Sequence, residues 1–175
     1  MEQFTGKVWV LGDDIDTDII IPTEYLALPT VEDMKQYGFS PLRPELASQI
    51  QEGDIIVAGK NFGCGSSREQ APEIIKALGI QCVIAKSFAR IHMANLINAG
   101  IIPFIFEEEA DYDKIDLGDE LEIKDIRKKI KNGQSIVLFN KTKEIYIPLK
   151  VTFFERQIDI ILAGGTLNYA KLQNK

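Results

Sequence analysis

Residues 55–79, IIVAGKNFGCGSSREQAPEIIKALG, contain a strand, a glycine-rich loop and a helix in that order. The apolar run Ile55–Ala58 is typical of a buried strand, and the polar, glycine-rich loop follows at residues 59–67. The next segment, Arg68–Leu78, is predicted to be a helix that ends at Gly79. Its apolar side chains recur at helical spacing on one side: Ala71, Ile74, Ile75 and Leu78.

The same order of elements repeats further along the chain. Cys82–Ala85 is predicted as a second buried strand, and Ser87 can cap a helix that runs to Asn98 and stops at Gly100. Ile101–Phe106 is predicted as the next strand. Strands that alternate with helices in this way predict an α/β fold with a parallel βαβ core.

Shorter strands flank this core. Gly6–Gly12 is predicted as a buried strand that ends in a turn, and Phe153–Ala163 as the terminal helix. Additional short β-strands are predicted at Gly118–Ile123, Ser135–Phe139 and Glu144–Ile147. The length of 175 residues fits one domain, which we assign to residues 1–175.

A long loop separates the first strand from the βαβ core. An acidic turn at residues 13–18 precedes the strand-length apolar run Ile19–Ile21, and several prolines and glycines follow between Pro22 and Pro44. A short helix is predicted at Val31–Tyr37. Long loops in compact domains are commonly lids or binding loops, so residues 23–44 are a candidate for ligand recognition.

The composition argues against binding to nucleic acid or crossing a membrane. Lys and Arg number 20 and Asp and Glu 26, a net charge of −6, whereas phosphate binding needs clustered basic residues. The basic run Arg127–Lys129 is predicted to be a solvated surface. The apolar runs fall short of a bilayer span, and the N-terminus has no secretory pattern, so a cytoplasmic location is expected.

The chain is poor in residues that hold metals or act as bases near neutral pH. It contains two cysteines, Cys64 and Cys82, and one histidine, His92. Two thiols cannot provide a four-thiolate metal site or a disulfide framework. We therefore assign no metal ligand to this chain, and any metal chemistry would use ligands from elsewhere.

The glycine-rich loop is the best candidate for a binding site. Ser66, Ser67 and Arg68 are predicted at the N-terminus of the following helix, where free N–H groups and the helix dipole favour an anion. The planar fork of Arg68 suits a carboxylate. The loop lacks the pattern of a Walker motif and of a dinucleotide fingerprint. The structural alternative is a glycine-rich turn with a serine cap and a surface arginine.

Four ordered motifs resemble the family of 3-isopropylmalate dehydratase small subunits, which is related to the swivelling fourth domain of aconitase. The most specific one is GCGSSRE at residues 63–69, with Ala71-Pro72 after it. The others are GDDIDTD at 12–18 with Ile21-Pro22, SFARI at 87–91, and the asparagines Asn95 and Asn98 with Gly100. The resemblance covers about residues 5–165. It implies a swivelling β/β/α domain with the parallel core described above.

The resemblance also implies a function. Members of this family assist a stereospecific dehydration and rehydration of a hydroxy dicarboxylate, which isomerises 2-isopropylmalate and 3-isopropylmalate in leucine biosynthesis. A large partner subunit is expected to carry a [4Fe–4S] cluster that acts as a Lewis acid. The small subunit supplies a base and carboxylate contacts, and is active only with the large subunit. A homo-oligomer of the isolated chain is left open.

Residue roles follow from the matching positions. Ser66 matches the catalytic serine, whose deprotonated oxygen takes the proton α to a carboxylate, and backbone N–H groups with Arg68 would stabilise that alkoxide. Ser67 and Arg68 match substrate-carboxylate contacts. Asp18 matches an active-site aspartate, and Thr17 beside it is a weaker candidate for substrate binding. The alternative for Asp18 is an Asx-turn before a strand.

Three other positions receive structural interpretations. Cys64 is interpreted as a small loop residue, because the family places its cluster cysteines on the large subunit. His92 is predicted on a helix, where a lone histidine is more often a surface or core residue than a catalytic one. Gln70 stands where many members have histidine, and it cannot titrate, so any chemistry of that histidine is lost here.

The loop after Pro22 is the segment that the resemblance links to substrate choice. Its apolar residues Leu26, Ala27 and Leu28 complement an isopropyl or methyl group. A second, γ-carboxylate would need a cation, and the sequence between Lys7 and Lys35 has none. The alternative is a mobile loop whose apolar residues pack on the domain.

Several functions remain open on this basis. The chain fits isopropylmalate dehydration best, with the small subunits of homoaconitase and of citramalate or dimethylmalate dehydratase as alternatives. A non-catalytic carboxylate- or phosphate-binding module would use the same helix N-terminus without a partner. A purely structural or regulatory subunit is disfavoured, since the serines, Arg68 and Asp18 are all present.

Overall fold

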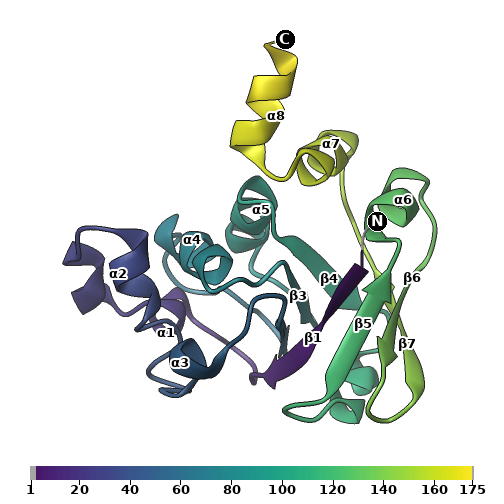
Figure 1. Ribbon diagram of the computed structural model, residues 1–175, viewed down its shortest axis with the longest axis horizontal. Helices are drawn as coiled ribbons and strands as arrows, with labels where there is room; N and C mark the ends of the chain where they lie inside the picture. The colour runs from purple at the N-terminus through teal and green to yellow at the C-terminus, as the bar shows by residue number, and fades with distance from the viewer. Residues whose placement is uncertain (1–2, 175) are drawn as a thin grey trace.

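A computed structural model describes residues 3–174 of the protein, and its centre is a β-barrel (Figure 1). Seven strands of the described chain close the barrel in the order β1-β2-β3-β4-β7-β6-β5. The strands are β1 Gln3–Val10, β2 Ile55–Ala58, β3 Cys82–Ala85, β4 Ile102–Phe106, β5 Glu120–Lys124, β6 Ile136–Asn140 and β7 Ile145–Lys150. Strands β1 to β4 are parallel neighbours, whereas β5, β6 and β7 pair antiparallel.

Two antiparallel pairings join the halves of the barrel. Strand β4 pairs with β7 at Ile105 and Phe106, and β1 pairs with β5 from Gln3 opposite Lys124 to Lys7 opposite Glu120. The first strand of the chain therefore lies between β2 on one side and β5 on the other. Gln3 of β1 pairs with Lys124 of β5, and these two residues are 124 − 3 = 121 positions apart in the sequence. The β5–β7 ribbon is thus part of the barrel wall.

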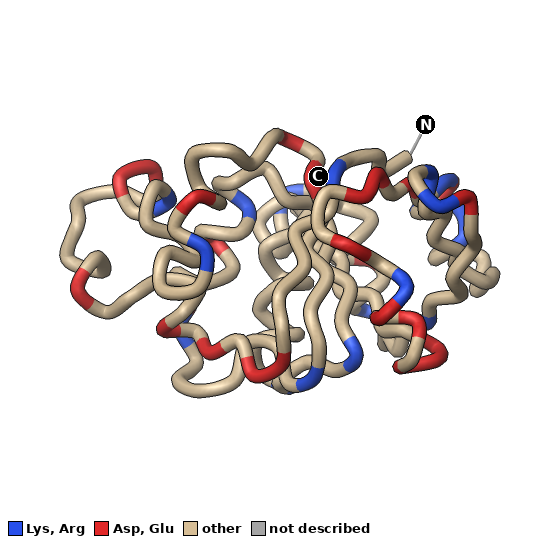
Figure 2. Tube along the Cα trace, turned by 90° about the horizontal axis from the view of Figure 1, so that it is seen from below, with Lys and Arg blue, Asp and Glu red and all other residues tan. Residues whose placement is uncertain are grey.

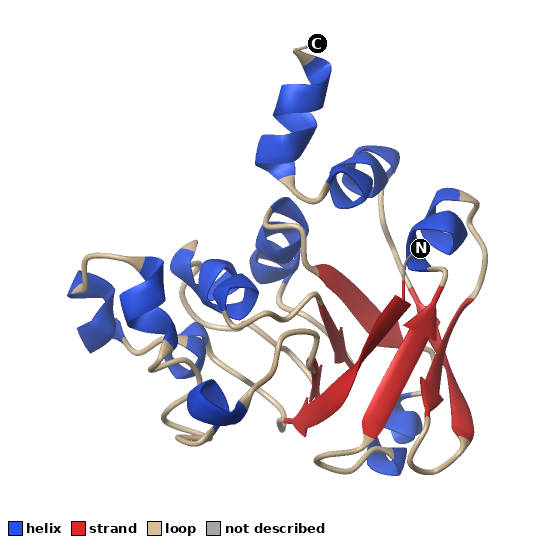
Figure 3. Ribbon diagram, in the orientation of Figure 1, coloured by secondary structure: helices blue, strands red, loops and turns tan. Residues whose placement is uncertain are grey.

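Helices surround the parallel half of the barrel. Figure 3 shows α1 to α4 gathered on one side of the strands, while α8 extends away from the other elements at the C-terminal end. The α-helices are α1 Thr17–Ile20, α2 Val31–Lys35, α3 Leu46–Gln49, α4 Gln70–Ala77, α5 Arg90–Asn98, α6 Ile126–Lys131, α7 Glu155–Ala163 and α8 Thr166–Gln173. The 3₁₀ helices are η1 Thr23–Ala27 and η2 Glu109–Lys114.

The parallel strands separate two hydrophobic clusters. Alternate residues such as Val57 and Ile84 contribute to the cluster inside the barrel. Their neighbours Ile56 and Val83 contribute to a second cluster, between the barrel and the helices around α4. Because successive side chains of a strand point to opposite faces, a strand that is covered on both faces is apolar throughout. This explains why β2 and β3 consist of four buried residues each.

The α/β class and the parallel βαβ core predicted from the sequence are confirmed. The predicted strands Ile55–Ala58 and Cys82–Ala85 have these bounds in the structure, and the short helix predicted within 31–37 is α2. Its N-cap is Thr30, whose hydroxyl accepts a hydrogen bond from Asp33 N. The short strands β5, β6 and β7, which were predicted as an addition to the core, instead complete the closed barrel.

The strand-length run Ile19–Ile21 follows the start of a helical turn, α1, which Asp16 caps by accepting a hydrogen bond from Asp18 N. Three local predictions were wrong. Ser87 does not cap α5, because Ala89 is the cap residue and Ser87 Oγ accepts a hydrogen bond from Asn61 N. Helix α4 begins at Gln70 instead of Arg68, and Phe153–Ala163 is followed by a further helix, α8.

Charged residues of both signs are interspersed over the loops and helices, as Figure 2 shows. The basic run 127–129 lies on α6, with Arg127 and Lys128 exposed and with Ile126 and Ile130 buried beneath them. Within residues 3–174, none of the helices combines the length and the hydropathy needed to cross a membrane.

Candidate active site

The loops that follow β1, β2 and β3 meet at one edge of the barrel. The carboxyl ends of parallel strands lie at the same edge, so loops that leave them become neighbours. Gly63 N donates a hydrogen bond to Ile15 O at 2.8 Å, which joins the second loop to the first. Phe62 N donates to Ser87 O at 3.0 Å, and Ala89 N donates to Phe62 O at 2.9 Å, which joins the second loop to the third. The glycine-rich loop is therefore clamped from both sides.

Two glycines of this loop occupy positions where a side chain cannot fit. Gly63 and Gly65 have φ values of +83° and +89°, which L side chains rarely adopt. A Cβ on Gly63 would lie 2.1 Å from Cγ of His92, and one on Gly65 would lie 2.5 Å from the Asp16 carboxylate. The loop thus lies directly against the imidazole on one side and against the first loop on the other.

Ser66 lies on the exposed part of this loop, beside Thr17. The Thr17 hydroxyl donates to Ser66 O at 2.7 Å, and the two hydroxyl oxygens are 3.4 Å apart. Because the single proton of Thr17 is used on the carbonyl, its oxygen can only accept a hydrogen bond from Ser66. Thr17, a weaker candidate from the sequence, is fully buried and is the residue that positions Ser66.

Arg68 is fixed to the first loop and to the start of the 23–44 segment. Its Nη2 lies 2.5 Å from Asp18 Oδ1, and Nη1 and Nη2 donate to Ile21 O at 3.1 Å and to Thr23 Oγ1 at 2.8 Å. The Arg68 side chain is 17% exposed, whereas that of Asp18 is 58% exposed. The structure therefore brings Ser66, Thr17, Asp18 and Arg68 to one corner, with the exposed hydroxyl of Ser67 beside them.

The predicted stabilisation of a Ser66 alkoxide needs correction. The N–H of Gly63 is bonded to Ile15 O, so it is not free to bind an oxyanion. The polar contacts of Arg68 within the described chain go to the first loop and Thr23, not to Ser66. The serines also precede the first residue of α4 by three positions or more, since that helix begins at Gln70. The N–H groups of residues 65–67 have no acceptor within the described chain.

The residues predicted to recognise the substrate lie on η1 and its C-terminal cap. Leu26 and Leu28 are half-buried and pack against the hydrophobic cluster around α4, whereas Ala27 is exposed. The rings of Tyr25 and Tyr37 are stacked with centroids 3.8 Å apart, which ties η1 to the end of α2. The segment is a packed turn whose first residue, Thr23, is bonded to Arg68.

The described residues do not fit an iron–sulfur cluster. Residues 3–174 contain no group of three or more His, Cys, Asp or Glu side chains placed to hold a metal ion. Cys82 is buried in the barrel, and burial raises the pKa of its thiol far above the ordinary value. Burial, with the nearby charges of Asp16 and Asp14, also raises the pKa of the Cys64 thiol. Thiolates, which clusters need, are thus disfavoured at both positions.

His92 is a core residue that also borders the site. Its ring packs edge-on against Phe62 at 5.4 Å, and burial lowers its pKa to about 4. The Nε2 atom is buried and has no hydrogen-bond partner in the described chain. The sequence pattern placed this histidine on a helix without showing that it supports the glycine-rich loop.

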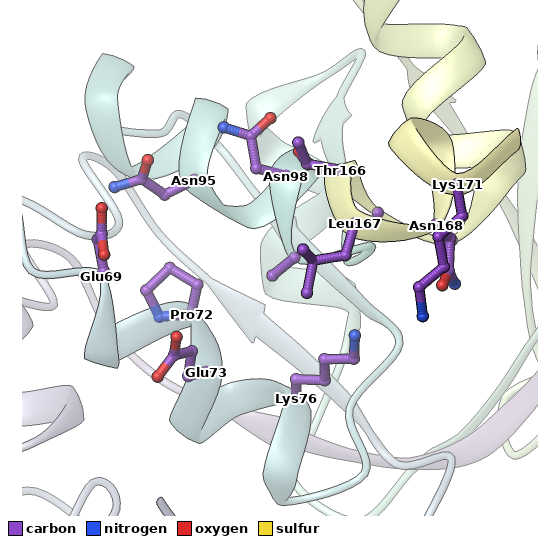
Figure 4. Close-up of a pocket in the computed structure, with 13 residues that line it drawn as sticks. Glu69, Pro72, Glu73, Lys76, Asn95, Asn98, Thr166, Leu167, Asn168 and Lys171 are labelled. Carbon is purple, nitrogen blue, oxygen red and sulfur yellow. The ribbon is translucent and has the colours of Figure 1, made fainter. Parts of the chain in front are cut away.

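A separate groove of about 570 Å³ lies between α4, α5 and the α7–α8 turn. Figure 4 shows Lys76 of α4 and Leu167 of α8 on opposite sides of this groove, with Asn95 of α5 above Pro72. None of the predicted site residues lines it. The groove is therefore distinct from the corner formed by Ser66 and Arg68.

Comparison with known proteins identifies the fold and the family. Residues 27–109 match the family model of the aconitase C-terminal domain. Curated proteins named 3-isopropylmalate dehydratase small subunit are similar over nearly their whole length. The one from Lachnospira eligens is 56% identical over 99% of this chain and 97% of that protein. The one from Methanosarcina mazei is 46% identical over 95% of each.

A solved structure agrees with these relatives. The crystal structure of 3-isopropylmalate dehydratase (leuD) from Methanocaldococcus jannaschii superposes with a TM-score of 0.87 at 39% sequence identity. The match covers 99% of this chain and 96% of that chain. With such identities over nearly its full length, the chain belongs to the family of 3-isopropylmalate dehydratase small subunits.

Proposed function

We propose that this chain is the small subunit of a 3-isopropylmalate dehydratase, a heteromeric hydro-lyase of leucine biosynthesis that acts only with a large subunit. The observation that carries the proposal is the exposed Ser66, held by buried Thr17 at the corner that also contains Asp18 and Arg68. This corner occurs in a chain whose relatives bear that name over nearly their full length.

Ser66 is the proposed base. An ordinary serine hydroxyl is far too weak for this role, so its alkoxide must be stabilised. The N–H groups of residues 65–67 are the available donors, and the Thr17 oxygen restricts where the Ser66 proton points. The Ser66 oxygen would take the proton from the carbon next to a carboxylate, while the hydroxyl group leaves the neighbouring carbon as water. Rehydration reverses these steps on the other carbon.

Arg68, Ser67 and Asp18 are the proposed carboxylate-binding residues. In the isolated chain the Asp18 carboxylate occupies the Arg68 guanidinium, much as a substrate carboxylate would. Because Asp18 is mostly exposed, it can move aside or share the guanidinium when a substrate arrives. Asp18 would thereby keep Arg68 oriented towards the site when no substrate is bound, which reduces the cost of ordering it.

The cluster would be bound by the large subunit and would supply a Lewis acid for the departing hydroxyl. This division of tasks agrees with the raised pKa values of both thiols in this chain. It also agrees with the exposure of Ser66 and Ser67, which a partner must cover to exclude water from the reaction.

The segment 23–44 is the proposed substrate-recognition loop. Its first residue contacts Arg68, and Ala27 presents an exposed apolar surface between half-buried Leu26 and Leu28. The sequence has no Lys or Arg between Lys7 and Lys35 to neutralise an additional carboxylate. These features favour the isopropyl group of isopropylmalate over the γ-carboxylate of homoaconitate, with citramalate or dimethylmalate as smaller alternatives.

The proposal is tested by anaerobic reconstitution with the candidate large subunit. Formation of the unsaturated acid is followed with isopropylmalate, citramalate and homoaconitate side by side. We expect isopropylmalate to be used best, and Ser66→Ala to reduce kcat at least a thousandfold. Ser135→Ala is the matched control, because this serine is exposed on the antiparallel half of the barrel.

Each contrary outcome has a distinct meaning. Preference for homoaconitate would overturn the substrate argument and keep the reaction class. Full activity of Ser66→Ala would overturn the serine base. Binding of the dicarboxylate without turnover, in a complex with an intact cluster, would favour a non-catalytic carboxylate-binding module.

A further inference from the structure

Besides the groove at α4 and α5, the structure has a pocket on the side of the glycine-rich loop that faces away from Thr17 and Arg68. It has a volume of about 740 Å³ and is open to solvent. The lining residues are Asn61, Gly63, Cys64, Gly65, Ser67, Ala89, Arg90, Ile91 and His92. Ser66, Thr17, Asp18 and Arg68 do not line it. Ser67 is the residue shared with the candidate active site, so the pocket continues the site past the loop.

The donors around this pocket favour an anion. Ala89 provides no side-chain cap to α5, so the first N–H groups of this nine-residue helix lack both an intrahelical acceptor and a cap. The exposed side chain of Arg90 stands at the same helix end. The N-terminal end of a helix and an arginine both favour a carboxylate. Asp14 and Asp16, whose charges raise the pKa of the Cys64 thiol, are not among the lining residues.

The orphaned imidazole of His92 is the second, independent observation. Buried polar atoms normally have a hydrogen-bond partner, and His92 is only 3% exposed while its Nε2 has none. The ring carbons Cγ and Cδ2 face the Gly63 backbone, so a small shift of the loop would change the surroundings of Nε2. A group that enters the pocket from outside this chain can supply the missing acceptor.

The rim of the pocket indicates a protein partner. The side chain of Ile91 is 59% exposed next to Arg90. An exposed apolar residue beside an arginine, around a wide opening, is typical of a protein interface, where a few such residues carry most of the binding energy. The proposed function also requires a partner to cover Ser67, which lines the pocket, and Ser66 next to it.

We infer that this pocket docks an acidic side chain of the large subunit, with Arg90 and the N-terminus of α5 binding its carboxylate and Ile91 packing at the rim. The inference rests on the proposed function, because it identifies where the large subunit of that enzyme binds. Docking would act on the serine loop through His92, which lies against Gly63. His92 is thus a positioning residue, and assembly and ordering of the site are coupled.

The single histidine of the chain gives a direct spectroscopic test. The small subunit is labelled with ¹⁵N-histidine, and the two imidazole nitrogens are followed by NMR as unlabelled large subunit is added anaerobically. We expect the Nε2 resonance to shift on assembly to that of a hydrogen-bonded N–H. Isopropylmalate added to the small subunit alone should leave it unchanged. A shift with substrate alone would overturn the inference in favour of a substrate subsite, and no shift on assembly would also overturn it.

Surface variants test the docking without disturbing the core. We expect Arg90→Glu and Ile91→Asp each to raise the Kd of the complex at least tenfold, with activity recovered as the large subunit is increased. The matched controls are Lys128→Glu on α6 and Leu117→Asp, whose side chain is 51% exposed. Both controls should leave the Kd and the activity within twofold.

The outcomes separate this inference from the proposed function. Unchanged Kd values for Arg90→Glu and Ile91→Asp, in an active enzyme, would overturn the docking site and leave the dehydratase intact. Weakened assembly in a complex that has no dehydratase activity would support the docking site and contradict the proposed function.

Discussion

The two halves of the barrel differ in whether their polar side chains have hydrogen-bond partners within the chain. In the antiparallel half, the buried Asp119 accepts hydrogen bonds from Asp116 N at 2.9 Å and from Asn140 Nδ2 at 2.8 Å, and Lys143 lies 3.6 Å from it. In the parallel half, Ser66 and Ser67 are exposed and His92 Nε2 is orphaned. Stable folds satisfy their buried polar groups, and exceptions cluster at functional sites. On the proposed function, this difference distinguishes the half that serves as scaffold from the half that would bind ligands.

The topology of the strands explains this division. Parallel strands send three successive loops to one edge, where segments from different parts of the sequence must contact each other. In the antiparallel half, β6 pairs with β5 and β7, its neighbours in the sequence, so the polar groups of the connecting turns find hydrogen-bond partners within the same ribbon. If function follows this division, substitutions in the loops of the parallel half should change activity, and substitutions in the antiparallel half should not.

The largest effect is expected at Gly63. Gly63→Ala places a methyl group against the His92 ring and forces an L side chain to a φ of +83°. The left-handed backbone costs about 1–2 kcal/mol and the overlap about 1–3 kcal/mol, so we expect a loss on the order of 4 kcal/mol in the free energy of unfolding. Urea denaturation measures it. Activity of the reconstituted enzyme should fall as well, because Ser66 lies on the same loop.

The matched control is Gly118→Ala in the antiparallel half. Gly118 has a φ of +89°, but a Cβ there would meet nothing within 4 Å. We expect a loss of about 1 kcal/mol from the backbone alone and unchanged activity. If both substitutions reduced the free energy of unfolding equally, the contact with His92 would contribute nothing to stability.

The second prediction concerns the pH dependence of stability. The pKa of His92 is about 4 in the folded chain, below its ordinary value of 6.5 because of burial. As the pH falls below 6.5, the unfolded chain binds a proton that the folded chain rejects, so stability decreases until about pH 4. From pH 7.5 to 5 this contributes a loss of about 2 kcal/mol.

The comparison of wild type with His92→Phe isolates this contribution. Urea denaturation at both pH values should show a smaller decrease for the variant, because it retains a ring beneath the loop but cannot titrate. Parallel decreases in the two proteins would contradict the role of His92.

A third, smaller effect is expected from Arg68→Lys. Lysine keeps the charge but loses the fork that reaches Asp18, Ile21 O and Thr23 together. We expect KM to rise at least tenfold with little change in the free energy of unfolding. Steady-state kinetics with isopropylmalate measure KM, and Lys143→Arg in the antiparallel half is the reciprocal control. An unchanged KM would remove Arg68 from carboxylate binding.

The smallest effect is expected from Asp119→Asn. Burial opposes ionisation of this carboxyl, but bonds from Asp116 N, Asn140 and Lys143 outweigh it and hold its pKa below the ordinary value. Such a carboxylate stabilises the fold above its unfolded pKa and loses that contribution as the pH falls through the folded one. We expect Asp119→Asn to reduce stability by about 1–2 kcal/mol at pH 7 and to leave kcat unchanged. A reduced kcat would contradict the division between the halves.

The parallel half was predictable because its strands carry a strong local signal. Strands β2 and β3 are four-residue apolar runs between turns, and their predicted bounds are those of the structure. Closure of the barrel was not predictable from local pattern, because β1 and β5 are paired across most of the chain. Helix α8 was missed since none of its residues is buried, so no apolar periodicity marks it.

The site was partly predictable. The motif at residues 63–69, with Ala71-Pro72, identified the serine loop, and the structure places Arg68 against Asp18. The contact between Thr17 and Ser66 joins residues 49 positions apart, and the strand-length run Ile19–Ile21 gives no sign of the capped helical turn that contains Thr17. The contact of His92 with Gly63 brings together two separate segments of the chain. The spacing of apolar residues in α5 does not predict such a contact.

The pairing of β1 with both β2 and β5 bears on how the chain folds during translation. As the protein leaves the ribosome, Gln3–Val10 can join β2 early, but its other edge stays open until Glu120–Lys124 has emerged. An open strand edge invites pairing with another chain. For most of its synthesis the nascent chain therefore carries an aggregation-prone edge at its N-terminal end, which only the later ribbon can cover.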